Sequence, residues 1–255
     1  MKKKILAMCL VVALLATAIV GATLAYFTDT TDKVQNTFTM GNVTITLDEA
    51  AVDTDDKAIP NADRVIKNEY SNKMVPGHVF DKDPTIHVAD DSEDCYVFLD
   101  IEFNRFNSLA WVMAKEHGVA DTYITNGKFS SSAFAQDMMA NKEMRIAILN
   151  KWFSGIEHVN WEIKDVKVEG DYMTIRLAYI GAGDPILSGG DDVCFMTAVK
   201  MPETVTQQMI DAAKVDGGMQ NVFNAGSLHM NLTAYAIQAD ELATVADAYA
   251  ALFNP

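Results

Sequence analysis

The hydrophobic and polar positions change their period along the chain, and these changes divide it into segments. Residues 5–25 are uncharged throughout, whereas Val43, Ile45 and Leu47 alternate with threonines. Alternation with period two is typical of a strand with one buried face. Residues 26–37 lie between these two patterns, are polar and show no clear period, so we expect them not to fold on their own.

The clearest strand pattern lies at residues 94–104. Its side chains alternate between an apolar face and a partly acidic one: Val97, Leu99, Ile101 and Phe103 against Tyr96, Phe98, Asp100 and Glu102. The pattern predicts one packed face and one face in water. Further strands are expected at residues 84–88, 161–168, 173–179, 193–201 and 227–239.

Two local irregularities are expected in this β region. The phase of alternation breaks near Lys164 and Asp165, which indicates a bulge. Glu169, Gly170 and Asp171 then predict a tight hairpin turn.

Helical spacing appears in three places. Residues 131–153 carry apolar side chains three, four or seven positions apart, within a segment of about 105–158 that breaks the β pattern. A short helix is expected within residues 202–214. A C-terminal helix is expected over 240–253, with Asp240 as its cap.

The fold class that follows is mainly β, an antiparallel sandwich with helical insertions in a single domain over residues 38–255. Strand spacing alone does not distinguish a jelly roll from an immunoglobulin-like sandwich.

The first 25 residues have the plan of a secretory leader. Three lysines precede an apolar run at residues 5–20, and small residues at Thr23 and Ala25 predict cleavage between Ala25 and Tyr26. The alternative is a retained membrane anchor, because 21 uncharged residues are just enough to cross a bilayer. We therefore expect a secreted or cell-surface protein that meets the membrane only through this segment.

Several stretches resemble the TasA/camelysin family of exported proteins of Gram-positive bacteria. They are Gly21–Thr30 (GATLAYFTDT), Asn36–Val43 (NTFTMGNV), Met74–Gly77 (MVPG), Lys82–Ile86 (KDPTI), Ser92–Val97 (SEDCYV) and Leu232–Asp240 (LTAYAIQAD). These stretches bracket residues 21–240, whereas the middle of the chain, roughly 105–160, shows no such resemblance.

The resemblance implies a jelly-roll fold, processing by a dedicated signal peptidase of the SipW type, and a role as a fibre subunit of a biofilm matrix. Its partners would be further copies of itself and other matrix proteins. The segment 26–37, with Tyr26, Phe27 and Val34, would be donated as a strand to a neighbouring subunit after cleavage. Pairing within its own domain is the alternative. The resemblance also implies a second function class, a camelysin-like cell-surface metalloendopeptidase.

The net charge of −15 would become −18 after loss of the three leader lysines. Such an acidic surface repels nucleic acids and anionic lipids, so neither is expected as a partner. It suits a soluble exported protein, or one that binds divalent cations between subunits.

Two cysteines, Cys95 and Cys194, remain after cleavage. An even number in an oxidising compartment permits one disulfide between them, and two buried free thiols are the alternative.

Residues suited to catalysis are few. None of the five histidines lies in H-E-x-x-H, and the chain has no G-x-S-x-G. We expect no catalytic residues and no cofactor. Two acidic clusters, Asp53/Asp55/Asp56 and Asp184/Asp191/Asp192, have the oxygen ligands that calcium prefers, but they are expected to be solvated loops. A third function class, an adhesin or glycan-binding module, would need exposed aromatics, and Trp111, Trp152 and Trp161 are too scattered in the sequence to decide.

Overall fold

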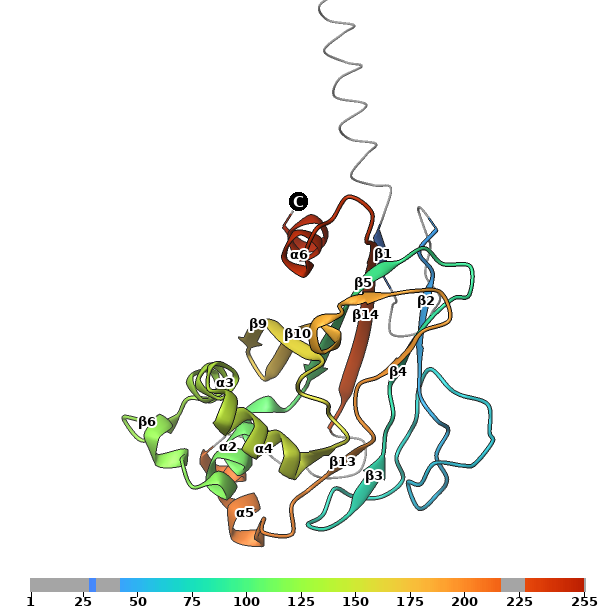
Figure 1. The fold of residues 1–255 in the computed structure, drawn as a ribbon. Helices are drawn as coiled ribbons and strands as arrows, with labels where there is room; N and C mark the ends of the chain where they lie inside the picture. The colour runs from blue at the N-terminus through green and yellow to red at the C-terminus, as the bar shows by residue number, and fades with distance from the viewer. Residues whose placement is uncertain (1–27, 31–41, 217–227, 255) are drawn as a thin grey trace, which may run out of the picture.

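The computed structural model describes residues 28–30, 42–216 and 228–254, and in them the chain is mainly β (Figure 1). Every pairing between named strands is antiparallel. The mainly β, antiparallel part of the predicted fold class is therefore confirmed, whereas the leader predicted for residues 1–25 lies outside the described residues. None of the described helices is long and apolar enough to span a bilayer.

The largest sheet has six strands. Five follow the order β1-β14-β5-β10-β9, and β11 pairs with one end of β5. The bounds are β1 (Thr28–Thr30), β5 (Cys95–Phe103), β9 (Trp161–Glu169), β10 (Tyr172–Tyr179), β11 (Ile186–Leu187) and β14 (Met230–Gln238). The long central strands β5, β10 and β14 fall where alternation predicts them.

Three smaller sheets complete the β structure, in the orders β12-β4-β2, β3-β13-β8 and β6-β7. The bounds are β2 (Ile45–Asp48), β3 (Val79–Asp81), β4 (Thr85–Val88), β6 (Ile124–Thr125), β7 (Lys128–Phe129), β8 (Phe153–Ser154), β12 (Asp192–Cys194) and β13 (Ala198–Lys200). The single strand predicted for residues 193–201 is wrong. The chain there leaves one small sheet after Cys194 and enters another at Ala198.

The predicted bulge and hairpin are confirmed. Arg176 pairs with Asp165 and Leu177 with Ile163, so Lys164 is the extra residue on β9. Gly170 has a φ of 61°, a left-handed conformation that suits glycine in the turn between β9 and β10.

The helices are α2 (Phe106–His117), α3 (Ser131–Ala140), α4 (Lys142–Trp152), α5 (Gln207–Asp216) and α6 (Val245–Phe253), with 3-10 turns η1 (Ala120–Tyr123) and η2 (Gly181–Gly183). The helical insertion predicted at 105–158 thus contains three helices. Its predicted stripe is interrupted at Asn141, which ends α3 and begins α4, with its side-chain oxygen accepting the Met144 N–H at 3.1 Å.

The C-terminal helix starts later than predicted. Thr244 is its N-cap, and the threonine hydroxyl accepts the Asp247 N–H at 3.1 Å. The predicted cap, Asp240, lies in the preceding turn and accepts a hydrogen bond from Gln238.

The main core lies on one face of the large sheet. Leu99 and Ile101 of β5 belong to one buried cluster with Ile45 and Ile86 of the β12-β4-β2 sheet and with Phe106 of α2. Helices α3 and α4 and the β3-β13-β8 sheet contribute to the same cluster. Small sheets and helices together therefore form a second layer over this face, which confirms the packed face predicted for β5.

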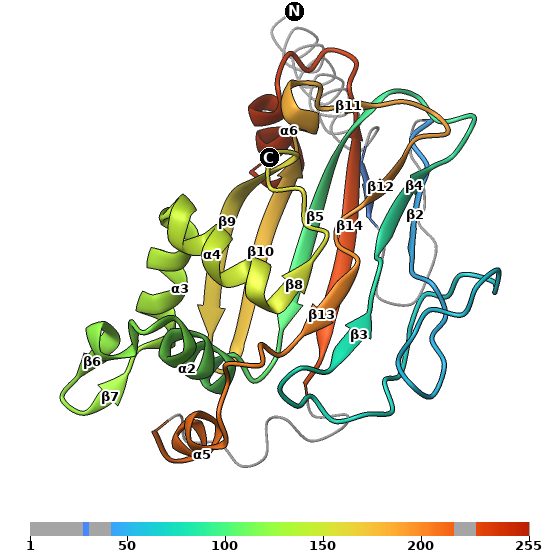
Figure 2. The same ribbon diagram turned by 60° about the horizontal axis from the view of Figure 1, so that its bottom comes forward.

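The opposite face of β5 was predicted to lie in water, and for Tyr96 and Phe98 this prediction is wrong. Tyr96 and Phe98 are 2% and 0% exposed, because α6 packs over them. The rings of Phe98 and Phe253 meet edge to face at 5.4 Å between centroids. Figures 1 and 2 show α6 at the end of the molecule opposite to α2 and α5.

Candidate functional site

The N-terminal strand β1 occupies one edge of the large sheet. Its three residues pair with β14 in the register Thr28–Ile237, Asp29–Ala236 and Thr30–Tyr235. β9 forms the opposite edge. Residues just after the predicted cleavage position therefore pair with the last strand of the same chain.

The edge that β1 covers would otherwise expose backbone donors and acceptors of β14. Ala236 and Ile237 are buried, at 0% and 4% exposure. A three-residue strand contributes few hydrogen bonds, each worth about 1 kcal/mol net, so its pairing is weak compared with that of the nine-residue partner β5. The geometry combines a sheet edge with a short covering strand.

The residues predicted for cleavage and strand donation are Ala25, Tyr26, Phe27 and Val34. All four lie outside the described residues, on either side of β1. Their roles remain predictions.

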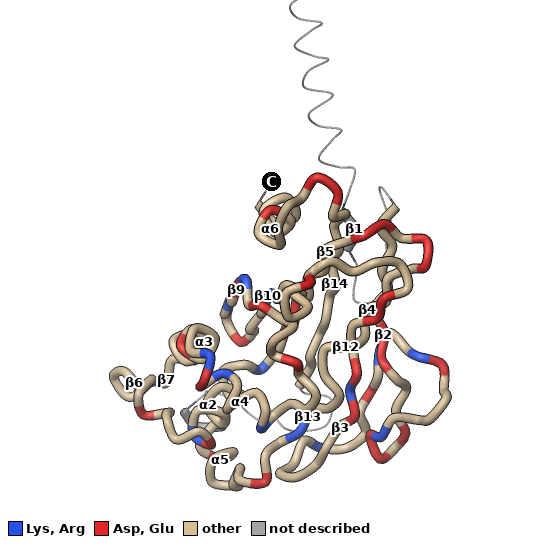
Figure 3. The backbone as a smooth tube through the Cα atoms, viewed as in Figure 1, with Lys and Arg blue, Asp and Glu red and all other residues tan. Residues whose placement is uncertain are grey.

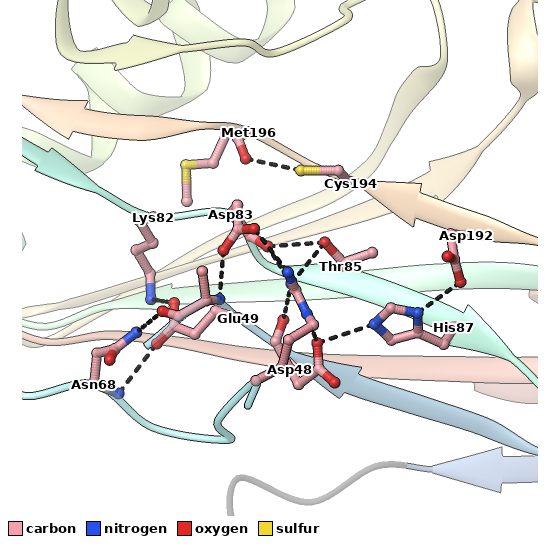
Figure 4. Close-up of polar contacts among 12 residues, drawn as sticks. Asp48, Glu49, Asn68, Lys82, Asp83, Thr85, His87, Asp192, Cys194 and Met196 are labelled. Carbon is pink, nitrogen blue, oxygen red and sulfur yellow. Dashed lines mark hydrogen bonds and ion pairs between the residues drawn. The ribbon is translucent and has the colours of Figure 1, made fainter. Parts of the chain in front are cut away.

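A polar network lies on the neighbouring sheet β12-β4-β2 (Figure 4). Its basic centre is Arg64, whose guanidinium bonds Asp48 through Nε, Asp83 Oδ2 at 2.9 Å and Thr85 Oγ1 at 2.9 Å. Burial by itself would lower the pKa of Arg64, but the two carboxylates outweigh it and raise the pKa. This one side chain thus fixes the loop after β2 to the start of β4.

His87 extends the network across the sheet. Its Nε2 lies 2.9 Å from Asp48 Oδ1 and its Nδ1 lies 2.6 Å from Asp192 Oδ1. The three residues come from the adjacent strands β4, β2 and β12. Burial would lower the pKa of His87, but both aspartates outweigh it and raise the pKa.

A second ion pair beside the network is buried. Lys82 Nζ bonds Glu49 Oε2, and the side chains are 10% and 8% exposed. The other oxygen of Glu49 accepts the Asn68 N–H at 3.2 Å. These contacts connect the loop after β2 to the segment before β4.

Asp56 is an exception within the acidic loop that was predicted to be solvated, because Asp53 and Asp55 are exposed whereas Asp56 is buried. Its carboxylate is fully buried, 2.9 Å from His78 Nε2, and accepts the Ser71 N–H at 2.9 Å. Burial would raise the pKa of Asp56, but hydrogen bonds from Asn72, His78 and Ser71 lower it. This aspartate therefore organises the loop rather than facing water.

Three other aspartates of the two predicted calcium clusters, Asp53, Asp191 and Asp192, have separate hydrogen-bond partners. Asp53 accepts the backbone N–H groups of Asp55 and Lys57, both at 2.9 Å. Asp191 accepts the Ser188 N–H, whereas Asp192 bonds His87. Neither cluster converges on a common point.

The residues around His87 do not fit a metal centre. Both ring nitrogens already bond carboxylates, and the guanidinium of Arg64 occupies the space beside Asp48 and Asp83. A dication would meet that positive charge. Across the described ranges 42–216 and 228–254, no three or more His, Cys, Asp or Glu side chains are arranged to hold a metal ion.

The two cysteines are free thiols in the structure, so the disulfide considered from the sequence is not formed here. Cys95 is buried on β5, and burial raises the pKa of its thiol to about 12. Cys194 is exposed on β12 and donates to the Met196 carbonyl at 3.0 Å. A thiol such as Cys95 behaves as a small apolar core residue.

The three tryptophans offer no exposed platform for a glycan. Trp111, Trp152 and Trp161 are 3%, 1% and 8% exposed, and all belong to the main core. The sequence did not reveal this, because scattered tryptophans suit either role.

Sequence reasoning missed the network of Arg64 and His87. Its members are up to 144 residues apart in the chain, and none stands in a recognisable motif. Only His87 lies in a predicted strand. Asp48 directly follows one predicted strand and Asp192 directly precedes another, and nothing in the sequence indicates that these three strands are neighbours.

Comparison with known proteins gives one match. Residues 1–73 match the family model described as camelysin metallo-endopeptidase, a segment that includes β1, β2 and the loop with Arg64. No curated protein and no solved structure matches the chain. Residues 1–73 of the chain are thus similar to the camelysin family, which includes TasA-like proteins, in agreement with the resemblance predicted from the sequence.

Proposed function

We propose that this protein is a secreted structural subunit of the cell surface or of a biofilm matrix, with a jelly-roll-like body, which assembles into fibres by strand addition. Cleavage between Ala25 and Tyr26 by a dedicated signal peptidase frees the N-terminal segment. The observation that carries the proposal is the pairing of Thr28–Thr30 with Tyr235–Ile237 at the sheet edge.

Strand addition uses a contact of this kind between two chains. Main-chain hydrogen bonds supply the affinity when an extended segment adds to an open edge. The register in which β1 pairs with β14 within one chain can also form between two chains. For this, β1 leaves the edge of its own sheet and pairs with β14 of a neighbouring subunit. Each subunit then gives one strand and receives one, and the head-to-tail contact does not close, so a filament grows.

The connection between β1 and β2 is long enough for this exchange. Residues 31–44 separate Thr30 from Ile45. Fourteen residues span at most about 50 Å when fully extended. That reach exceeds the spacing of adjacent strands, about 4.8 Å, several times over, so β1 can pair outside its own domain.

The matched proline variants test the proposal. Alternate N–H groups of a strand point to opposite sides, so Asp29→Pro and the double variant Thr28→Pro/Thr30→Pro remove donors on different sides of β1. One of the two removes donors that face β14, and the other removes donors that face away. The variant that loses the donors facing β14 should form no filaments, and the variant that loses the donors facing away should assemble. Electron microscopy of the exported protein distinguishes the two outcomes.

Deletion of residues 26–37 is a stronger test of strand donation than the proline variants. A folded monomer without filaments is the expected product, with circular dichroism as the check on folding. Filaments formed by the deletion variant, or equal assembly of both proline variants, would reject strand donation by this segment.

The matched family's description supports a second candidate, a cell-surface metalloendopeptidase. A casein or peptide assay of the purified protein, with and without a chelator, separates the two. Chelator-sensitive cleavage that persists in the deletion variant would favour the protease, whereas filaments without cleavage favour the structural subunit.

A further inference from the structure

The outer strand of the large sheet, β9 (Trp161–Glu169), has an open edge. Among the described strands it pairs only with β10, and a groove of about 870 Å³ opens beside its outer side. Met139 of α3 and Ile163 of β9 are among the residues that line this groove. Figure 2 shows β9 as the last strand on its side of the sheet, so this side of its backbone can receive another strand.

The contacts of β9 with β10 show which of its backbone groups lie on the open edge. The carbonyl of Asn160, directly before β9, accepts the Ile180 N–H at 2.7 Å, and it therefore points toward β10. Successive residues of a strand direct their backbone groups to alternate sides. The groups of Trp161 and Ile163 consequently point away from β10.

The bulge shifts this alternation by one residue. Lys164 is the extra residue of β9, so regular pairing with β10 resumes at Asp165. The Val166 N–H donates to the Asp165 carboxylate at 2.8 Å rather than to β10. Val166, and by alternation Val168, therefore also direct their backbone groups to the open edge. Four apolar residues, two on each side of the bulge, thus carry the donors and acceptors that another strand would use.

The sequence of β9 complements itself when a second copy of the strand runs antiparallel to it. In one register every residue faces a partner of matching chemistry, apolar against apolar and acid against lysine. The pairs between the two copies are Trp161 with Val168, Glu162 with Lys167, Ile163 with Val166, and Lys164 with Asp165. A twofold axis between Lys164 and Asp165 repeats each pair, and cross-strand pairs of these kinds stabilise sheets.

Neighbouring registers lack this agreement. A shift by one residue sets Ile163 opposite a charged residue, either Asp165 or Lys167. A shift by two residues brings like charges together, Glu162 against Asp165 or Lys164 against Lys167. The charges and the apolar residues of β9 therefore select one alignment of the two strands.

The bulge also keeps the paired side chains on matching faces. In a regular strand Ile163 and Val166 would lie on opposite faces, because they are three positions apart. With Lys164 as the extra residue, both pack against the main core. Glu162 and Lys167 are exposed on the other face. The apolar pairs between two copies would thus continue the core, and the ion pairs would stay at the surface.

Charges and a bulge on an edge strand usually protect it from pairing. In β9 the charges form only local ion pairs, Lys164 with Glu162 at 2.7 Å and Lys167 with Glu169 at 2.8 Å. The glutamates of these pairs are 52% and 70% exposed, so their exchange for cross-strand pairs costs little. Figure 3 shows basic and acidic segments together on β9. Two copies of this strand therefore repel each other far less than the net charge of −15 would suggest.

We propose that β9 is a dimerisation edge, at which a second copy of the chain pairs its own β9 antiparallel in this register. The large sheets of the two copies then join into one continuous sheet. The contact is isologous and closes on itself. It lies on the edge opposite β1, so it does not compete with strand exchange at β14. Where strand exchange builds filaments, the same contact joins two of them side by side.

A disulfide test reads the register directly. Glu162→Cys and Lys167→Cys, each in a Cys194→Ser background that removes an exposed native thiol, are mixed under reducing conditions and then oxidised. In the proposed register the two Cα atoms lie about 4.5–5.5 Å apart, within reach of a disulfide. Either variant alone holds its two thiols about 17 Å apart along the strands. We expect a cross-linked dimer on a non-reducing gel from the mixture and not from either variant alone.

Charge reversal tests the same pairs without a new bond. Glu162→Lys should weaken dimerisation about tenfold, because two like-charged pairs replace two opposite ones. The double variant Glu162→Lys/Lys167→Glu should restore it. Glu69→Lys is the matched control: it changes the net charge equally and breaks an exposed pair with a lysine two residues away. Sedimentation equilibrium of the exported protein, after removal of any filaments, measures each dimerisation constant.

Any of three results would overturn the proposal. They are a mixture that cross-links no better than the single cysteine variants, dimerisation that Glu162→Lys leaves unchanged, and a double variant that dimerises no better than Glu162→Lys. Circular dichroism checks that each variant is folded. Neither readout requires filaments, so failure of this contact is distinguishable from failure of strand donation.

Discussion

At the scale of single residues, the buried pair Lys82–Glu49 dominates the loop after β2. Removing one partner of a buried ion pair leaves the other charge without compensation, which costs about 3–5 kcal/mol. We expect Lys82→Met to lower the free energy of unfolding by about 3 kcal/mol. Urea denaturation followed by tryptophan fluorescence measures it.

The exposed pair Lys67–Glu69 gives the matched control, since its side chains are 70% and 82% exposed. Lys67→Met should change stability by less than about 0.5 kcal/mol. Adding Glu49→Gln to Lys82→Met should recover part of the loss. Equal effects of the two lysine substitutions would show that burial does not govern the Lys82 pair.

His87 should make stability depend on pH. Its folded pKa is raised by Asp48 and Asp192, so the protonated form stabilises the fold. The contribution is fully present below the unfolded pKa of about 6.5 and is lost as pH rises through the higher folded pKa. The difference in urea midpoint between wild type and His87→Gln should therefore shrink as the pH rises above about 6.5. A difference between wild type and His87→Gln that stays constant, or grows as pH rises, would contradict the stabilising role of the protonated imidazole.

Individual contacts such as these could not be read from the sequence. Asp56 stands in a run of aspartates that indicates a wet loop, yet its neighbours Ser71 and His78 satisfy it in the interior. Carboxylate burial depends on whether such donors arrive from distant parts of the chain, and the sequence gives no measure of that.

At the scale of elements, the start of α6 offers a test of helix capping. Thr244 accepts the Asp247 N–H, whereas Asp240, the residue predicted as cap, accepts a hydrogen bond from the side chain of Gln238. Thr244→Ala should cost about 1 kcal/mol of stability. Asp240→Ala should cost less than about 0.5 kcal/mol. Urea denaturation checks both, and a larger loss for Asp240→Ala would return the cap to the predicted position.

A close contact at Gly155 supplies a second test at this scale. Gly155 has a φ of +77°, and an added Cβ would lie 2.5 Å from Thr197 Oγ1 and 2.9 Å from the Thr197 nitrogen. Gly118 has a similar φ of +82° with nothing within 4 Å. Both alanine variants bear the left-handed strain of about 1–2 kcal/mol, but only Gly155→Ala should also disturb the pairing of β8 with β13.

Thermal unfolding distinguishes the two variants. Gly155→Ala should melt several degrees below Gly118→Ala, because its added Cβ clashes with backbone that cannot move freely. Identical melting temperatures would indicate that the chain around Gly155 and Thr197 accommodates the added Cβ without loss of stability.

Element prediction succeeded where period and turn chemistry agree. The strand β5, the hairpin at Gly170 and the bulge at Lys164 all follow from alternation and its interruptions. Within the predicted helical insertion it gave no separate helix for α2, because the residues of α2 are not segregated into a buried and an exposed face: eight of the twelve are buried. A helix buried on most of its surface lacks the amphipathic period that identifies helices in a sequence.

At the scale of the whole molecule, net charge should limit stability. A charge of −15 repels itself across the surface, and salt screens that repulsion. We expect the urea midpoint to rise as sodium chloride increases from about 0.02 to 0.5 M.

Calcium chloride at equal ionic strength completes the experiment. The same rise in both salts indicates screening alone. A further rise at low millimolar calcium would instead indicate specific binding at an acidic loop such as residues 184–192. A fall of the urea midpoint in both salts would show that salt weakens stabilising ion pairs more than it relieves the repulsion between like charges.

The sequence by itself determined the strands whose alternation is regular, the helical interruption at 105–158 and the resemblance carried by its first residues. Each of these depends only on residues that are close together in the sequence. Only the tertiary structure decided which strands are neighbours. That decision places β1 on β14, covers Phe98 with α6, and brings His87 between two aspartates. Pairings between distant segments depend on how whole layers pack, and period along the chain carries no information about them.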